Sequence, residues 1–145
     1  ETLAAWKNLW YHSGDLGYLD DEGYVFFVGR EAHWIRRRGE NVSAFEVEKA
    51  MTAHEAVIDC AVVGVPSEIG EEDIKAYVQL SEDVPRPEPM ELVEWCKDRI
   101  AFFKVPRYME FVTEFPRTMT KNEIARHELR EQGVGDAIDV LPDNR

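Results

Sequence analysis

Three short segments of the sequence carry residue types that could act on a phosphorylated ligand. In the first segment, residues 11–15, the carboxylate of Asp15 follows Gly14. A carboxylate on a loop of this kind can accept two hydrogen bonds from a vicinal diol such as that of ribose. The same residue could instead form an Asx-turn that starts a β-hairpin, and the segment on its own favours that structural role.

The second segment begins at Gly29 and Arg30 and continues through residues 34–41, Trp-Ile-Arg-Arg-Arg-Gly-Glu-Asn. The fork of an Arg guanidinium suits phosphate or ribose oxygens. Gly39 would let the backbone approach a ligand closely, because glycine has no Cβ. Three adjacent arginines in an acidic protein could equally form a solvated strand edge that discourages aggregation. Residue chemistry by itself favours neither the ligand-binding site nor the solvated strand edge.

The third segment, residues 116–122, is a polar loop that contains Lys121. A lysine on a mobile loop can bring a positive charge to an anionic transition state, although a solvated surface lysine is the commoner case. The four histidines, His33 among them, show no metal-ligand spacing, and we expect them at helix caps or on the surface. The sequence therefore predicts no metal ligands.

The composition limits the classes of protein that these segments can serve. The chain has 145 residues, 44% of them hydrophobic, which suits one packed domain that needs no disulfide or metal to fold. Its 17 basic and 29 acidic residues give a net charge of −12, which argues against nucleic acid or an anionic membrane as partner. No apolar stretch approaches the roughly 20 residues that cross a bilayer, and no signal peptide is evident. We therefore expect a cytoplasmic protein without a membrane span.

Local patterns predict a β-hairpin and then a helix in the first third of the chain. Residues 20–23, Asp-Asp-Glu-Gly, have turn chemistry and separate two segments rich in aromatic and β-branched residues. Ser43 and Glu46 have the spacing of a capping box, in which each side chain accepts a hydrogen bond from the backbone N–H of the other residue. Val47 and Met51 then follow the spacing of an amphipathic helix.

Strands and helices alternate in the remainder of the sequence. Residues 57–65 are nearly all apolar, which favours a central strand covered on both faces. Residues 74–80 alternate in the manner of a half-buried strand, and residues 108–113 form a third extended segment. Residues 90–103 and 124–131 have helical spacing. These elements predict an α+β fold, with a small three-stranded sheet packed with two to three helices and preceded by β-hairpins.

Six motifs occur in an order that is more specific than any one of them. They are Trp10-Tyr11-His12-Ser13-Gly14-Asp15-Leu16-Gly17, Gly23-Tyr24 through Gly29-Arg30, Ile35 through Ser43 with Glu46-Val47-Glu48, Val62-Val63-Gly64-Val65-Pro66, Lys104-Val105-Pro106-Arg107 and Pro116-Arg117-Thr118. With these motifs, roughly residues 10–131 resemble the C-terminal part of the adenylate-forming acyl-CoA synthetases, a superfamily that includes luciferases and peptide-synthetase adenylation domains. The run Arg-Gly-Glu-Asn-Val-Ser looks most like ligases of the crotonobetaine/carnitine-CoA kind.

The resemblance implies a reaction in two steps. A carboxylic acid substrate attacks the α-phosphate of ATP, assisted by Mg²⁺, and coenzyme A (CoA) then displaces AMP to give the thioester. Such chemistry depends mostly on positioning and on charge stabilisation. The resemblance also implies an N-terminal domain that works with a small, rotating C-terminal domain. This chain alone is therefore expected to be inactive.

The resemblance assigns roles to the three segments. Asp15 matches the carboxylate that holds the ribose hydroxyls, and Arg30 matches an arginine that contacts the nucleotide. The loop formed by Arg38, Gly39 and Glu40 matches the part that lines the pantetheine path in the thioester step. These residues and Lys121, as the catalytic residue, make up the predicted site.

The sequence departs from the family pattern at three places. Ser13 stands where a threonine is usual, and Ala32 stands at the hinge position, which is usually Asp or Lys. The catalytic lysine of the family directly precedes an Ile or Val, whereas here Glu123 precedes Ile124 and the nearest lysine is Lys121. Lys121 could take over that role, or Glu123 could simply cap the last helix and leave adenylation slow or lost.

The resemblance divides the chain into residues 1–30, the end of the N-terminal domain with its hairpin, residues 31–132, the mobile domain, and residues 133–145, a tail expected to fray. Two alternatives remain open at this point. The chain could be a diverged, non-catalytic module that binds a nucleotide or a partner, or it could belong to an adenylation domain that serves a carrier protein.

Overall fold

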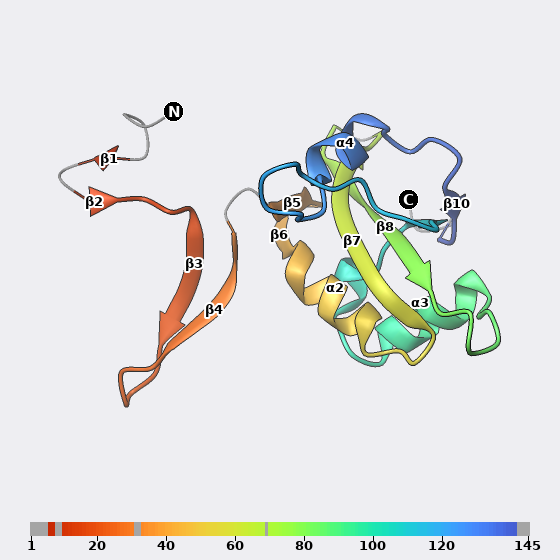
Figure 1. Ribbon diagram of the computed structural model, residues 1–145, viewed down its shortest axis with the longest axis horizontal. Helices are drawn as coiled ribbons and strands as arrows, with labels where there is room; N and C mark the ends of the chain where they lie inside the picture. Colours follow the sequence, from red (N-terminus) through yellow and green to blue (C-terminus); the bar gives the residue numbers. More distant parts are fainter. Residues whose placement is uncertain (1–5, 8–9, 31–32, 69, 142–145) are drawn as a thin grey trace.

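The computed structural model describes residues 6–7, 10–30, 33–68 and 70–141 (Figure 1). A β-hairpin near the N-terminus extends away from a body in which helices pack on both faces of a sheet (Figure 1). The fold class is α+β, as predicted. Ala32, the expected hinge residue, lies outside the described residues.

Within the described residues, the body is built on a four-stranded sheet in the order β10-β9-β8-β7. β7 (Val57–Pro66) and β8 (Glu72–Leu80) are antiparallel, whereas β9 (Tyr108–Phe111) runs parallel to β8. These are the three strands predicted from the sequence. The fourth strand, β10 (Ile138–Asp139), pairs with β9 and lies in the tail that we expected to fray.

The tail packs against the body through an ion pair and a buried side chain, and neither could be predicted from the periodicity of the sequence. The carboxylate of Asp139 forms an ion pair with Arg107 at 3.1 Å. The backbone N–H of Val140 donates to the carbonyl of Arg107, and the Val140 side chain is buried. The ordered body therefore continues beyond residue 132, at least to residue 140.

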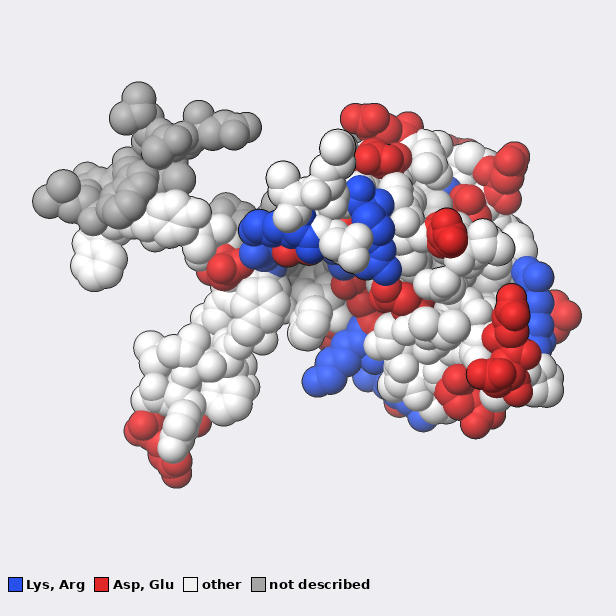
Figure 2. All heavy atoms as spheres, in the orientation of Figure 1, with Lys and Arg blue, Asp and Glu red and all other residues white. Residues whose placement is uncertain are grey.

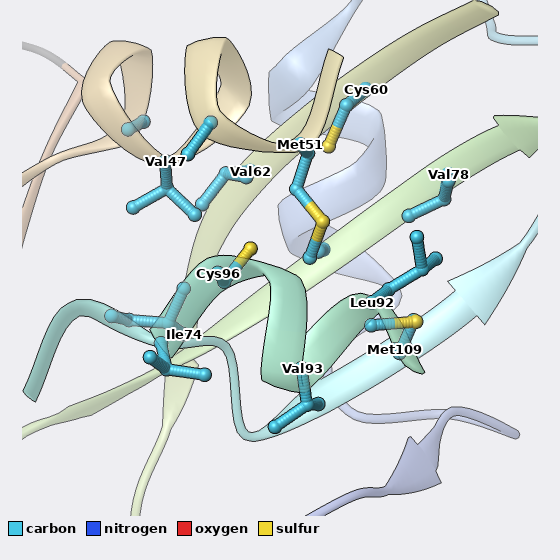
Figure 3. Close-up of a cluster of buried hydrophobic side chains, with 14 of the residues drawn as sticks. Val47, Met51, Cys60, Val62, Ile74, Val78, Leu92, Val93, Cys96 and Met109 are labelled. Carbon is cyan, nitrogen blue, oxygen red and sulfur yellow. The ribbon is translucent and has the colours of Figure 1, made fainter. Parts of the chain in front are cut away.

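Two helices cover one face of the sheet. α2 (Ala44–Thr52) precedes β7, and α3 (Pro89–Lys97) lies in the crossover that parallel strands such as β8 and β9 require. α3 is shorter than predicted, and a 3-10 turn (Phe102–Lys104) follows it. The described helices are all too short to cross a membrane. Side chains from both helices and three strands fill the core between them (Figure 3): Val47, Met51, Cys60, Val62, Ile74, Val78, Leu92, Val93, Cys96 and Met109.

The C-terminal part of the chain covers the opposite face of the sheet. Leu129 of α4 (Arg126–Glu131) packs in a second cluster with Tyr77 of β8. Lys75, on the same face, is fully buried and donates to the carbonyls of Gly133 and Val134 at 3.0 and 2.9 Å. β8 is therefore buried on both faces, and the prediction of a half-buried strand is wrong because a distant segment supplies the second cover.

Antiparallel strand pairs precede the sheet: β1 (Trp6–Lys7) with β2 (Trp10–Tyr11), β3 (Asp15–Leu19) with β4 (Val25–Arg30), and β5 (Trp34–Arg37) with β6 (Glu40–Ser43). The hairpin of β3 and β4 was predicted from its turn chemistry. Asp20 closes that turn, because its carboxylate accepts the backbone N–H groups of Glu22 and Tyr24 at 3.0 and 2.9 Å.

The predicted capping box at the start of α2 does not form. The helix begins after Ser43 as expected, but the Ser43 side chain makes no capping hydrogen bond. The carboxylate of Glu46 instead binds Nζ of Lys104 at 2.7 Å. Val47 is completely buried, so burial of the apolar face, rather than the cap, places the helix.

Candidate active site

Asp15 and Arg30 face each other across the two strands of the β3–β4 hairpin. They are directly opposite in the β3–β4 register, and Asp15 Oδ1 lies 2.9 Å from Arg30 Nε. The turn role belongs to Ser13, whose Oγ accepts the backbone N–H of Asp15 at 3.2 Å. The two side chains are 41% and 45% exposed, so their pairing contributes little to stability and leaves both accessible to a ligand.

A pocket of about 190 Å³ lies beside Arg30, between the hairpin and the body. Figure 2 shows basic side chains gathered in this region. An adjoining pocket of about 360 Å³ extends over β7 and α4. The smaller pocket is lined by Phe27, Gly29, Arg30, His33, Phe45, Glu48, Glu123 and Arg126. His33 and Arg126 line both pockets.

His33 is a half-buried wall of these pockets rather than the cap or surface residue that we expected. Burial lowers the pKa of His33, and the positive charges of Arg126 and Arg30 lower it further. The imidazole is therefore neutral at physiological pH and can accept a hydrogen bond on one ring nitrogen.

Arg126 is held by a carboxylate that the sequence analysis missed. Its Nη2 contacts the two carboxylate oxygens of Glu48 at 2.9 and 3.0 Å, and Glu48 Oε1 also accepts the backbone N–H of Val62. Burial raises the pKa of Glu48, and the charge of Arg126 opposes that rise. The pair joins α2, β7 and the start of α4. Because 78 residues separate its members, no local pattern could reveal it.

The lysine loop, residues 116–122 with Lys121, is a short loop whose two ends are joined by hydrogen bonds. Thr118 and Glu123 bind each other twice: the Thr118 N–H donates to the Glu123 carbonyl at 2.8 Å, and the Glu123 N–H donates to Thr118 Oγ1 at 3.2 Å. Asn122 has a positive φ of 55°, and Lys121 is exposed. Glu123 lines the smaller pocket but does not cap α4, since Ala125 occupies the N-cap without a side-chain bond. The alternative in which Glu123 caps the last helix is therefore wrong.

The predicted pantetheine loop, Arg38 to Glu40, includes the turn of the β5–β6 hairpin. Arg37 and Glu40 close a two-residue turn in which Arg38 and Gly39 have positive φ values of 51° and 80°. These angles fit the type I′ turn that matches the twist of a hairpin. A Cβ at Gly39 would meet nothing within 4 Å, so the glycine serves the backbone conformation and an open approach.

The structure thus joins some of the predicted site residues and separates others. Asp15 and Arg30 form one group beside the pocket that Glu123 lines. The Arg38–Glu40 turn lies on a different hairpin, and Lys121 on a third segment. No cluster of three or more His, Cys, Asp or Glu that could hold a metal occurs among the described residues.

Comparison with known proteins decides the family. Residues 46–122, just over half of the chain, match the AMP-binding enzyme C-terminal domain. The chain belongs to that family. It is 42% identical over 118 residues to a crotonobetaine/carnitine–CoA ligase of Proteus mirabilis (strain HI4320), a match that covers 81% of this chain and 23% of the relative. The chain therefore spans about a quarter of the length of that ligase.

Solved structures of adenylate-forming enzymes have the same fold as this AMP-binding C-terminal domain. The o-succinylbenzoate CoA synthetase of Bacillus subtilis, in complex with its acyl-adenylate intermediate, matches with a TM-score of 0.80 and 32% identity over 88% of this chain and 26% of its own. The amide bond synthetase McbA of Marinactinospora thermotolerans matches with a TM-score of 0.80 and 29% identity, over 90% of this chain and 26% of its own. The predicted resemblance to the adenylate-forming superfamily is confirmed.

Proposed function

We propose that this AMP-binding C-terminal domain works in an AMP-forming acyl-CoA ligase, together with an N-terminal domain that holds the acid and the adenine. A carboxylate oxygen of the acid attacks the α-phosphorus of ATP and pyrophosphate leaves. The CoA sulfur then attacks the acyl carbonyl, AMP leaves, and the thiol proton passes to solvent. The observation that carries the proposal is the Asp15–Arg30 pair beside the pocket that Glu123 lines. It supports the proposal because the two residues that we assign to the nucleotide lie next to the end of the loop that contains Lys121.

In this proposal the Asp15–Arg30 pair binds the nucleotide. The carboxylate of Asp15 accepts hydrogen bonds from the ribose hydroxyls. Arg30 uses Nε for Asp15, so its terminal nitrogens can face phosphate or ribose oxygens. The pair therefore holds each side chain ready for the ligand before the ligand arrives, which reduces the ordering needed on binding.

The remaining predicted residues act at the other reactants. The Arg38–Gly39–Glu40 turn lines the pantetheine path, and its open approach at Gly39 supports that role. Exposed Lys121 brings a positive charge to the adenylation transition state. Mg²⁺ comes with the phosphates of ATP, which supply hard oxygen ligands.

We place the division between the two domains near residue 30. The hairpin of β3 and β4 exposes large apolar side chains on both strands and in the turn between them: Tyr18, Leu19, Tyr24, Val25, Phe26 and Phe27. A two-stranded hairpin is marginally stable by itself, and contiguous exposed apolar surface marks an interaction site. Contact with the N-terminal domain would cover this surface, whereas residues from 31 onwards form the mobile domain.

The proposal is tested by joining the chain to an N-terminal adenylate-forming domain, for example in place of the C-terminal quarter of the Proteus mirabilis ligase. Acid-dependent exchange of pyrophosphate into ATP measures the first step, and thioester formation from a preformed acyl-adenylate measures the second. We expect both steps with CoA. Substituting Asp15→Ala should abolish most of the pyrophosphate exchange. A folded protein that performs neither step with any acid would contradict the proposal.

One observation favours a second candidate function. Glu123, rather than a lysine, lines the pocket beside Arg30 at the position directly before Ile124. A module that had lost adenylation would still bind a nucleotide or a partner. AMP binding without pyrophosphate exchange would support this candidate. Acyl transfer to a phosphopantetheinyl carrier protein, with none to free CoA, would instead indicate an adenylation domain that serves a carrier.

A further inference from the structure

Two consecutive acidic residues, Glu71 just before β8 and Glu72 at its start, bind the β5–β6 hairpin at its turn and along one edge. Glu71 Oε2 accepts the backbone N–H of Gly39 at 2.8 Å. Glu72 Oε2 accepts the backbone N–H of Arg36 at 3.1 Å, and its other oxygen pairs with Arg130 at 3.0 Å. These carboxylates attach the hairpin to the body through its backbone, at positions 32 and 36 residues away in sequence.

The bond to Gly39 uses a donor that the hairpin leaves without a ladder partner. In a two-residue turn the N–H of the residue after the turn, Glu40, belongs to the closing pair with Arg37, whereas the N–H of the second turn residue points outward. Glu71 supplies a charged acceptor for that N–H, and such charge-assisted bonds are stronger than neutral ones. The carboxylate therefore stabilises a turn that contains Arg38, a non-glycine residue with positive φ.

The turn is also anchored to the body by the residue that precedes it. Arg37, which directly precedes it, is 1% exposed, and its Nη1 donates to the carbonyls of Phe103 and Val105 at 2.9 and 2.8 Å. This end of the turn is part of the folded body. Glu71 is only partly buried and reaches the tip of the turn at Gly39. Loss of Glu71 should therefore change the tip of the turn without unfolding the body.

We propose that Glu71 is a positioning residue for acyl transfer: its carboxylate fixes the Arg38–Gly39–Glu40 turn in the conformation that admits the CoA thiol. This inference rests on the proposed function, because it takes the turn to line the pantetheine path. Glu71 binds the backbone of Gly39, whereas the proposed nucleotide contacts, Asp15 and Arg30, pair with each other on a different hairpin. It therefore acts on the thioester step and leaves adenylation unchanged.

The test uses the chain joined to its N-terminal domain and measures both half-reactions. The Glu71→Ala variant should raise the KM for CoA and lower kcat/KM for CoA about fivefold, the effect expected when one exposed charge-assisted hydrogen bond is lost. Its pyrophosphate exchange should match wild type. Glu71→Gln keeps an acceptor oxygen and should recover most of the loss. Glu68→Ala removes an exposed acid three residues earlier and serves as the control for charge.

A second readout does not depend on turnover. Hydrogen–deuterium exchange of the peptide that contains Gly39 should become faster in Glu71→Ala and return toward wild type in Glu71→Gln, because the Gly39 N–H loses and regains its acceptor. Unchanged exchange in Glu71→Ala would overturn the proposal, as would unchanged kcat/KM for CoA in an active enzyme. If the wild-type protein forms no thioester, the proposed function is contradicted. Faster exchange of the Gly39 peptide in Glu71→Ala than in wild type would in that case still confirm that Glu71 holds the turn.

Discussion

Arg37 and Asp73 form a buried ion pair that joins β5 to the start of β8, with Arg37 Nε 3.3 Å from Asp73 Oδ1. Asp73 Oδ2 also binds Arg107 Nη1 at 2.8 Å, so one carboxylate serves two arginines. Burial lowers the pKa of Arg37, and Asp73 opposes that shift. The carboxylate therefore balances buried charge beneath the turn that we assign to the thioester step.

Replacing this carboxylate should destabilise the body strongly. Asp73→Asn leaves Arg37 and Arg107 with less charge compensation, and breaking a buried pair typically costs about 3–5 kcal/mol. The free energy of unfolding, measured by urea denaturation with tryptophan fluorescence, should fall by about 3 kcal/mol. Asp83→Asn, at an exposed position, is the matched control and should change it by less than about 0.5 kcal/mol. Equal stability of the two variants would show that Asp73 does not balance the arginines.

His33 should make the stability of the protein depend on pH below its ordinary pKa of 6.5. Because burial and Arg126 lower the pKa of His33 in the folded state, the unfolded state binds more protons in the window just below 6.5. Stability should therefore fall as the pH drops through that window and stay level above it. His33→Asn should remove this part of the slope in urea unfolding curves taken between pH 5 and 8, a range chosen to span ordinary histidine titration. His12→Asn, at an exposed position, should keep the slope.

The elements that were predicted correctly depend on neighbouring residues. The first hairpin follows from Asp20 and the turn around it, and α2 follows from the apolar spacing that begins at Val47. The family motifs also predict Asp15 and Arg30 as site residues, and this assignment stays a prediction; the motifs could not show that the two side chains pair. These features involve few residues along the chain, and a local pattern can therefore indicate them.

The parts that were missed depend on contacts between distant segments. Glu48 meets Arg126 across 78 residues, and Glu71 meets the backbone of Gly39 across 32. A carboxylate that binds a distant backbone N–H has no signature in composition or periodicity. The same reason explains Glu46, whose capping spacing is real but whose carboxylate binds Lys104, 58 residues away. Tertiary contacts thus overrode the local signal at the helix start.

Gly64 should control the position of Glu72. A Cβ at Gly64 would lie 2.6 Å from the Glu72 carboxylate, which must then move. Gly64→Ala should therefore break the contacts of Glu72 with the Arg36 N–H and with Arg130, and lower the free energy of unfolding by about 1 kcal/mol. Adding Glu72→Ala to this variant should cost little more, because the displaced side chain has already lost its contacts. Fully additive effects in this double-mutant cycle would contradict the displacement.

Lys121 should serve adenylation and not acyl transfer. In the chain joined to an N-terminal domain, Lys121→Ala removes the positive charge of the loop and should slow pyrophosphate exchange by about 10²-fold or more, the effect of losing a charge that stabilises a transition state. Thioester formation from preformed acyl-adenylate should remain close to wild type. Lys97→Ala, which removes a helix lysine paired with Glu94, is the control and should affect neither step. If both half-reactions of Lys121→Ala proceed at wild-type rates, Lys121 is not a catalytic residue.

Glu123→Lys should restore adenylation to a Lys121→Ala protein. Glu123 lines the pocket beside Arg30 and directly precedes Ile124, so a lysine there would place its ammonium group where the family pattern has one. The exchanged charge also removes a carboxylate that would repel the phosphates of ATP. The double variant should therefore recover at least tenfold in pyrophosphate exchange over Lys121→Ala alone, an energetic gain of about 1.4 kcal/mol. Glu123→Gln in the same background separates the two effects, since it removes the repulsion without adding an ammonium group. If Glu123→Gln recovers as much as Glu123→Lys, the pocket needs only the loss of a negative charge, and a lysine before Ile124 adds nothing.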